Sequence, residues 1–325
     1  MSEDRSISIA LCTYNGALYI EEQLASIFRQ TLRPLEIVVV DDCSTDATVR
    51  ILRRIKKESE IPIRLYVNRR NVGVIGNFEK AVGLCRGDYV ALCDQDDVWL
   101  PEKLAIFCKE MTDTEAEHGN LTPILVYSDL RVADRDLGVR HESFNKFYVC
   151  PQEEHVLETL IVQNFVTGCV TMLNRPLIMN SMPIPEEAVL HDYWFALIAA
   201  TTGRIRYIPV PTVLYRQHSQ NVTGVRKKNA REYLTGMVRS DPFYRHYRYL
   251  QSQVRQLGAL VSYLDRNNIQ HNGTDLEEVY RQLTRGGLAA CIYCLRNRIY
   301  PQLPRRQLAF FWNLFFSSWY RTFRG

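Results

Sequence analysis

EIVVVDDCSTD, residues 36–46, is the stretch that decides the fold. Its β-branched run at 36–40 is typical of a strand that is buried on both faces of a parallel sheet. The acidic and hydroxyl residues that follow favour helix capping, so they predict a helix that runs to about Glu58. A buried strand that leads through a cap into a helix is half of a βαβ unit.

The same alternation continues on both sides of this stretch. Apolar runs predict further strands, and the segments between them predict helices; the strands are expected at 7–12, 64–67 and 89–93, and the helices at 17–30 and 76–85. Strands and helices at this spacing indicate a mostly parallel sheet with helices on both faces. We therefore expect a Rossmann-like α/β domain.

Beyond residue 120 the pattern is looser, and its expected elements are strands at 124–128, 166–173 and 204–214 and helices at 188–200, 229–268 and 275–300. Because strand signals end near residue 214, we expect the α/β domain to occupy residues 1–225 and a helical region to occupy residues 226–325.

Polar side chains follow three of the predicted strands. Thr13, Tyr14 and Asn15 come after the first strand, Asp41 after the second, and the acidic stretch 94–97 after the fourth. In parallel α/β sheets ligands bind beyond the carboxyl ends of the strands. One polar strand end is ordinary turn chemistry, but three at one edge predict a site.

Asp94 and Asp96 are the sharpest feature of that edge. Two carboxylates at positions i and i+2 can face one divalent ion and the diphosphate that the ion neutralises. Mg²⁺ and Mn²⁺ prefer such hard oxygen ligands, so the pair predicts one of these ions as a cofactor. The alternative is an acidic turn that caps the helix after Pro101.

Several motifs, in order over about the first 220 residues, resemble the family 2 glycosyltransferases. They are IVVVDDCSTD at 37–46, NVG at 71–73, GDYVALCDQDDVW at 87–99, NFVTGC at 164–169, HDYW at 191–194 and YRQH at 215–218. The resemblance implies the GT-A fold and inverting transfer of a sugar from a nucleotide-sugar donor to a glycan or lipid-linked acceptor. The DQDDVW form is similar to bacterial rhamnosyltransferases of polysaccharide and O-antigen assembly, which implies dTDP-rhamnose or else a UDP-sugar as donor.

The resemblance also implies roles for single residues. It places Thr13, Tyr14, Asn15, Asp41 and Asp94 at the nucleotide. It makes Asp94 and Asp96 the metal ligands, with Asp96 the more direct one.

Asp192 matches the catalytic base in the same resemblance, and Gly168, Trp194, Arg216 and His218 are expected near the diphosphate or the acceptor. Other interpretations stay open from the residues alone. Asp192 could be a helix-start carboxylate that binds backbone N–H groups. Trp194 could be core packing, and Arg216 and His218 could lie in an exposed loop.

Charge is divided unevenly along the chain. Residues 1–225 carry 23 Lys and Arg against 30 Asp and Glu, a net −7, whereas residues 226–325 carry 17 against 6, a net +11; the sum is +4. Residues 286–325 hold six arginines, no acidic residue and an aromatic run at 308–320 that is too short to span a bilayer. This combination predicts a monotopic helix on a membrane surface. The alternative is a helix that packs on the catalytic domain or on a second subunit of a homo-oligomer.

Other functional classes lack their signatures. No GxxxxGK[ST] motif is present, and the Gly-rich, Arg-containing loop of sugar nucleotidyltransferases is absent. The alternative function is a non-catalytic binding protein whose basic tail binds nucleic acid or a protein partner. The sequence has no nucleic-acid-binding motif, so we expect no nucleic-acid partner. The nine cysteines form no disulfide framework, and 291–294 is a lone CxxC. With no signal peptide at the N-terminus, we expect a cytoplasmic protein, peripheral on the inner face of the membrane.

Overall fold

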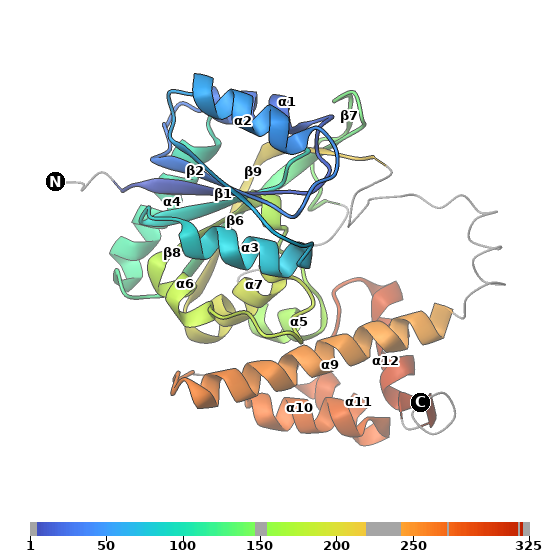
Figure 1. Cartoon of the computed structure of the whole chain (residues 1–325). Coiled ribbons are helices and arrows are strands. Elements are labelled where there is room, and N and C mark those ends of the chain that lie inside the picture. Colours follow the sequence, from blue (N-terminus) through green and yellow to red (C-terminus); the bar gives the residue numbers. More distant parts are fainter. Residues whose placement is uncertain (1–4, 147–154, 219–241, 272, 318, 321–325) are drawn as a thin grey trace. The chain divides into compact units, whose positions relative to one another are not determined.

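The computed structural model describes residues 5–146, 155–218, 242–271, 273–317 and 319–320 (Figure 1). The chain forms two compact units, each described by itself below. The α/β unit comprises Met1–Phe147, Val166–Ile184 and Leu190–Asn221, and the helical unit comprises Tyr148–Phe165, Pro185–Val189 and Val222–Gly325. The domain boundary expected at residue 225 lies outside the described residues.

Four parallel strands form the first half of the sheet in the α/β unit. They are β1 (Ile7–Thr13), β2 (Glu36–Asp41), β3 (Ile63–Val67) and β4 (Tyr89–Cys93), in the spatial order β3-β2-β1-β4. Three helices connect them: α1 (Ile20–Phe28), α2 (Thr48–Glu58) and α3 (Gly73–Leu84). Figure 1 shows α1 and α2 on one face of the sheet and α3 on the other. The expected alternation of strands and helices is therefore confirmed.

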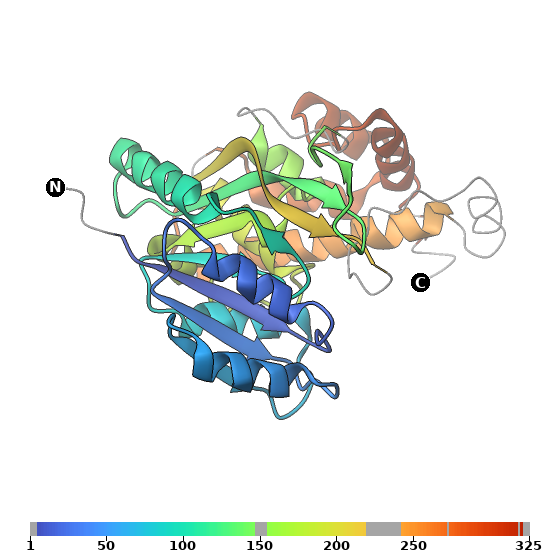
Figure 2. The ribbon, with the colours of Figure 1, turned by 90° about the horizontal axis from the view of Figure 1, so that it is seen from above.

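Burial explains why these segments form these elements. Every residue of β1, β2 and β4 is buried, as expected for strands that are covered on both faces. Helix α1 buries Ile20, Leu24 and Ile27, which recur at the helical spacing i, i+4 and i+7. In Figure 2, seen from above, the strands pass beneath α1 and α2.

The second half of the sheet is mixed. Strand β8 (Thr171–Asn174) pairs antiparallel with β4 and with β6 (Ile124–Ala133), and β9 (Arg204–Arg216) pairs parallel with β6. The short strands β5 (Val98–Trp99) and β7 (Val139–His141) pair antiparallel with β9 and β6. Helices α4 (Lys103–His118), α6 (Arg175–Ser181) and α7 (His191–Thr202) complete the unit.

One expected strand is partly wrong. Residues 166–173 were expected to be extended, but Gly168–Val170 form a 3₁₀ turn, η1, and β8 begins only at Thr171. The backbone N–H of Gly168 donates to a side chain of α7 instead of to a neighbouring strand. A tertiary contact has therefore overridden the local β-propensity.

The helical unit contains α5 (Val156–Val162), α9 (Pro242–Arg266), α10 (Leu276–Arg285), α11 (Gly287–Arg296) and α12 (Pro304–Phe315). The helix expected at 275–300 is broken at Gly286 and Gly287, whose φ angles of 69° and 79° are in the left-handed region. Of the helix expected at 229–268, residues 229–241 lie outside the described part of the chain. Among the described helices, none is long and apolar enough to cross a membrane. Cys291 and Cys294 are free thiols.

Candidate functional site

The carboxyl ends of β1 and β4 meet where the strand order of the sheet reverses. Such a switch point is where open α/β sheets bind ligands. Leu11 and Cys93 pair across the two strands, so the chain that follows each strand begins at the same level. The side chain of Gln95 joins the two loops, because its amide accepts from the N–H of Tyr14 at 2.9 Å and donates to the Tyr14 carbonyl at 3.0 Å.

Thr13 and Asp41 pair in register at the ends of β1 and β2. Asp41 Oδ2 accepts from Thr13 Oγ1 at 2.8 Å and from Ser44 Oγ at 2.6 Å, and both Thr13 and Asp41 are buried. Asn15 has a positive φ of 50°, and its Oδ1 accepts from the N–H of Thr45 at 2.9 Å. These side chains fix the loop, while Tyr14 is 48% exposed and can receive a ligand.

Asp42 has a role that the sequence pattern did not assign. Its carboxylate accepts from the backbone N–H groups of Val72 and Gly73 at 2.8 and 2.9 Å and from Asn68 Nδ2 at 2.9 Å. It therefore holds the NVG loop against the end of β2. The signal available in the sequence was the pair of carboxylates at 41 and 42 together with this motif.

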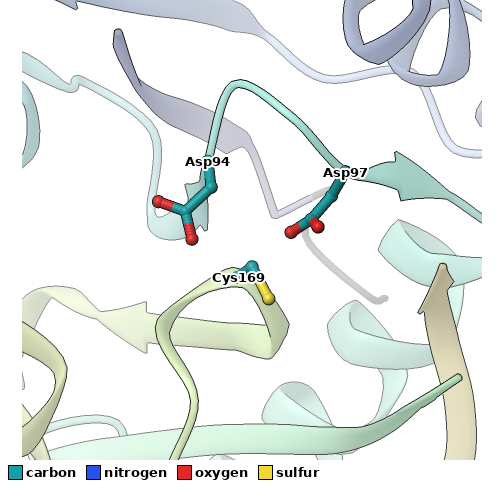
Figure 3. Close-up of side chains that lie close together, drawn as sticks. All are labelled: Asp94, Asp97 and Cys169. Atoms are coloured by element: carbon teal, nitrogen blue, oxygen red, sulfur yellow. The ribbon is translucent and has the colours of Figure 1, made fainter. Parts of the chain in front are cut away.

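An acidic cluster lies next to the switch point. One ligand atom each of Asp94, Asp97 and Cys169 lie within 4.8 Å of one another, and Figure 3 shows the two carboxylates turned toward the space above Cys169. Burial, followed by the charges of Asp96 and Asp192, raises the pKa of Asp94 to about 7. Burial also raises the pKa of Asp97 well above its usual value, with Asp96 and Asp94 adding to the effect. Several carboxylates thus share one poorly solvated place.

The cluster fits a divalent ion, although it differs from the predicted pair. Asp97 Oδ2 is buried, and the Cys169 thiol is a polar group next to the Asp97 carboxylate. Carboxylate oxygens suit Mn²⁺ or Mg²⁺, whereas the Cys169 thiol is a soft ligand that these ions do not prefer. Asp94 was predicted from the sequence; Asp97 and Cys169 were not.

Lys103 supplies a positive charge beside the cluster. It is 1% exposed, its Nζ donates to the Cys169 carbonyl at 2.5 Å, and it lies 3.6 Å from the ring centroid of Trp99. Burial lowers the pKa of Lys103 to about 8. In the sequence Lys103 looks like an ordinary surface residue at the start of a helix, so nothing in the local pattern could have identified it.

The end of β9 carries Arg216 and His218 to the acidic loop. His218 Nε2 lies 2.8 Å from Asp96 Oδ2, and Arg216 Nε donates to the Asp96 carbonyl at 2.8 Å. Arg216 is 3% exposed, also pairs with Glu22, and donates its backbone N–H to Asp97. The two residues are therefore buried against the site, and the exposed-loop interpretation does not describe them. Asp96 is bonded to His218 and is not part of the Asp94–Asp97–Cys169 cluster.

Asp192 lies in the first turn of α7 and is 8% exposed. Its Oδ2 accepts from the N–H of Gly168 at 2.9 Å, and its Oδ1 accepts from the N–H of Tyr193 at 2.6 Å. A Cβ atom on residue 168 would lie 3.1 Å from His191 Nε2 and 3.5 Å from Asp192 Oδ2, so glycine allows this close approach. Because Gly168, which donates to Asp192, immediately precedes Cys169 of the acidic cluster, Asp192 lies beside that cluster.

Two side chains next to Asp192 are part of the core. Trp194 is fully buried and its indole Nε1 donates to the Ser181 carbonyl at 2.8 Å, so its side chain is part of the core. His191 stacks on Phe78 with ring centroids 3.8 Å apart, and burial lowers its pKa to about 3. Of the residues predicted near the diphosphate or acceptor, the structure brings Gly168, Arg216 and His218 to the site, and Trp194 is the exception.

Comparison with known proteins agrees with this geometry. Residues 8–179 match the family model described as "Glycosyl transferase family 2". A dTDP-rhamnosyl transferase, RfbG of Shigella flexneri, is 30% identical over 223 residues, which are 66% of this chain and 73% of that protein. An uncharacterized protein of Mycobacterium tuberculosis is 29% identical over 219 residues, and the match spans 60% of its length.

Solved structures share the fold. The mannosyltransferase PcManGT from Pyrobaculum calidifontis, in complex with GDP-Man and Mn²⁺, gives a TM-score of 0.56 at 17% identity and covers 99% of this chain and 88% of that chain. Residues 1–349 of TarS from S. aureus, in complex with UDP-GlcNAc, give a TM-score of 0.52 at 19% identity and cover 78% of this chain and 66% of that chain. The GT-A fold expected from the sequence is confirmed.

Proposed function

We propose that this chain, which belongs to glycosyl transferase family 2, inverts the configuration at the anomeric carbon of the sugar it transfers and uses a divalent ion. The chain is a glycosyltransferase, and the proposal concerns its mechanism and substrates. The observation that carries it is the gathering of Asp94, Asp97 and Asp192 beside the switch point of the sheet. Inverting transfer needs a base for the acceptor and charge neutralisation for the leaving diphosphate, and these carboxylates can supply both.

Asp192 is the proposed catalytic base. An acceptor hydroxyl must lose its proton as it attacks the anomeric carbon, so a carboxylate must lie within hydrogen-bond reach of it. The N–H groups of Gly168 and Tyr193 hold the Asp192 carboxylate in a fixed orientation.

The acidic loop is the proposed metal site. We assign Asp94 and Asp96 to it, as the motif implies, with Asp96 at the edge of the cluster beside His218, and add Asp97 because its carboxylate lies in the cluster with Asp94. A bound Mn²⁺ or Mg²⁺ neutralises the charge that develops on the departing nucleotide diphosphate. Arg216 and His218 hold this loop through the Asp96 carbonyl and carboxylate.

The nucleotide is proposed to bind across the ends of β1 and β2. Tyr14 offers an exposed ring for stacking on a base, and Thr13, Asn15 and Asp41 shape the loop around it. The resemblance to RfbG favours dTDP-rhamnose as the donor, with a UDP-sugar as the second candidate. We propose a glycan or lipid-linked acceptor of bacterial surface polysaccharide synthesis.

The helical unit is proposed to lie on the cytoplasmic face of a membrane. On α12, Leu308, Trp312 and Phe315 are 76%, 49% and 43% exposed and recur at i, i+4 and i+7, so they form one apolar stripe. Arginines accompany them in the sequence, as is typical of interfacial helices. Of these arginines, Arg321 and Arg324 lie outside the described residues.

Replacing Asp192 by asparagine tests the assignment of the base. We expect kcat to fall by about 10²–10⁴-fold, the usual contribution of general base catalysis, with little change in donor affinity. Donor affinity is measured by calorimetry and turnover by release of the nucleotide diphosphate. An Asp192→Asn enzyme that turns over at more than a tenth of the wild-type rate would exclude Asp192 as the base.

A further inference from the structure

A cavity of about 370 Å³ opens on the surface of the helical unit and is lined by residues of α9 and α12 and by the end of α5. Its volume is within the range of small-ligand sites, which are about 300–1,000 Å³. Apolar groups form much of its wall, among them Leu250 of α9 and Phe310 of α12. None of the residues that line it has a proposed role in the transfer reaction, so the cavity is unexplained by that reaction.

Three basic side chains meet at this cavity. Arg245 and His246 come from α9, and Arg306 comes from the first turn of α12. All three residues are exposed and line the same cavity, and burial, followed by the charges of Arg245 and Arg306, lowers the pKa of His246. None of the described residues that line the cavity is acidic. A bound anion would therefore be attracted to this place.

Buried amides add polar groups to the same wall. Gln253 is 3% exposed and Asn313 is 1% exposed. Asn313 Nδ2 donates to the Ala309 carbonyl at 2.7 Å, but Asn313 Oδ1 has no hydrogen-bond partner in the part of the chain that the structure describes. Because buried polar atoms are normally paired, this oxygen suits a ligand that offers a hydroxyl.

We propose that the cavity binds the headgroup of an anionic glycerophospholipid. Its phosphate would meet Arg245 and Arg306, a headgroup hydroxyl would reach Asn313, and the first carbons of its chains would lie along Leu250 and Phe310. A free phosphate ion would use the cations but not the apolar wall, so a lipid fits the whole cavity better. The exposed apolar stripe of α12 gives the same unit a means of reaching a lipid surface.

Calorimetric titration of the full-length protein tests this site. Dihexanoyl phosphatidylglycerol, kept below its critical micelle concentration, is the probe; dihexanoyl phosphatidylcholine and inorganic phosphate are compared with it. We expect the phosphatidylglycerol to bind at least about tenfold more tightly than either of the other two, since only it combines net negative charge with apolar chains. Equal affinity for inorganic phosphate would show a free-anion site and overturn the proposal, as would a failure of phosphatidylglycerol to bind.

Matched double variants separate the cavity from general charge attraction. Arg245→Gln with Arg306→Gln removes two cations that line the cavity, whereas Arg248→Gln with Arg305→Gln removes two exposed cations from the same helices that do not line it. We expect the first pair to weaken binding by about tenfold or more and the second by less than about twofold. Equal losses in both pairs would contradict a built site.

A third variant fills the cavity without changing charge. Ala309→Trp places a large side chain at a half-buried position of the wall, and we expect it to abolish binding. Thermal unfolding of each variant shows whether it has folded, and unimpaired binding in a folded Ala309→Trp protein would refute the location. Nucleotide-sugar binding, measured on the same preparations, tests the transfer reaction separately, so the two proposals can fail independently.

Discussion

Between pH 7 and pH 5 the free energy of unfolding is expected to fall by about 2 kcal/mol because of His191, and replacing His191 by phenylalanine is expected to remove this loss. His191 is 5% exposed and stacks on Phe78, and neither ring nitrogen has a hydrogen-bond partner among the described residues. Burial lowers its pKa from 6.5 to about 3. The imidazole is therefore neutral in the folded protein throughout the physiological range.

The sign of the effect follows from where the proton binds. A histidine whose pKa is lowered by folding binds its proton in the unfolded chain first, so acid favours unfolding. Between pH 7 and pH 5 the unfolded chain protonates at this position while the folded chain stays neutral. With pKa values of 6.5 and about 3, the loss of stability over this interval is about 2 kcal/mol. At pH values above 7 the contribution is fully present.

Urea unfolding at pH 7 and pH 5, followed by tryptophan fluorescence, measures this difference. His191→Phe keeps the ring stack and His191→Leu does not, but neither side chain titrates. Any packing cost of either variant is the same at both pH values and cancels in the difference. If the free energy of unfolding falls by the same amount between pH 7 and pH 5 in the wild type and both variants, His191 is not held neutral by burial in the folded protein.

Two further predictions concern the metal site and the apolar stripe. Mn²⁺ at about 100 times its dissociation constant should raise the free energy of unfolding of the wild type by about 2.7 kcal/mol, measured by thermal unfolding. Asp94→Asn should abolish this stabilisation, and the exposed control Asp136→Asn should keep it. Equal stabilisation of all three proteins would place the ion elsewhere. Exchanging Leu308, Trp312 and Phe315 for serine should release the protein from phosphatidylglycerol vesicles in a flotation assay, because the free energy of membrane binding falls by about 0.8 kcal/mol for each buried CH₂ group that is removed. Serine at the exposed Leu121 and Met179 of the α/β unit should have no effect. Unchanged flotation of the triple variant would exclude the stripe as the membrane contact.

The parallel half of the fold could be predicted because its signals are local. The β-branched run that ends at Asp41 is buried along its whole length, and the capping residues that follow lead into α2. Leu24 and Ile27 show the helical period that places α1 on the sheet. Periodicity of this kind is set by neighbours within one or two turns, so a single sequence contains it.

The rest depends on contacts between distant parts of the chain. Arg216 at the end of β9 pairs with Glu22, 194 positions earlier, and with the Asp96 carbonyl, 120 positions earlier. Gly168 looks like a strand residue until Asp192 accepts its N–H. Lys103 resembles a surface residue until Trp99 and the Cys169 carbonyl enclose it. Apart from Trp99, which is four positions before Lys103, the nearest of these partners is 24 positions away, so no local pattern encodes them.

The candidate site shows the same division. Asp94 and Asp192 were proposed from their motifs, whereas Asp97 is recognised only through the cluster that it forms with Asp94 and Cys169 in the folded chain. Trp194 shows the limit of a motif, because its side chain lies in the core although Asp192 is only two positions earlier on the same helix. Helix residues two positions apart point in directions about 200° apart, so motif membership alone does not place a side chain in a site.

We propose that the edge formed by Thr13, Asp41 and Asp94 binds a nucleotide sugar with the help of a divalent ion. A panel of nucleotide sugars that includes dTDP-rhamnose and UDP-sugars, screened by thermal unfolding with and without Mn²⁺, tests it most directly. We predict that one donor raises the melting temperature of the wild type only when Mn²⁺ is present, and that Asp94→Asn loses the effect. If no donor stabilises the protein, or if a donor stabilises it equally well without the ion, metal-dependent binding of a nucleotide sugar at this edge is contradicted.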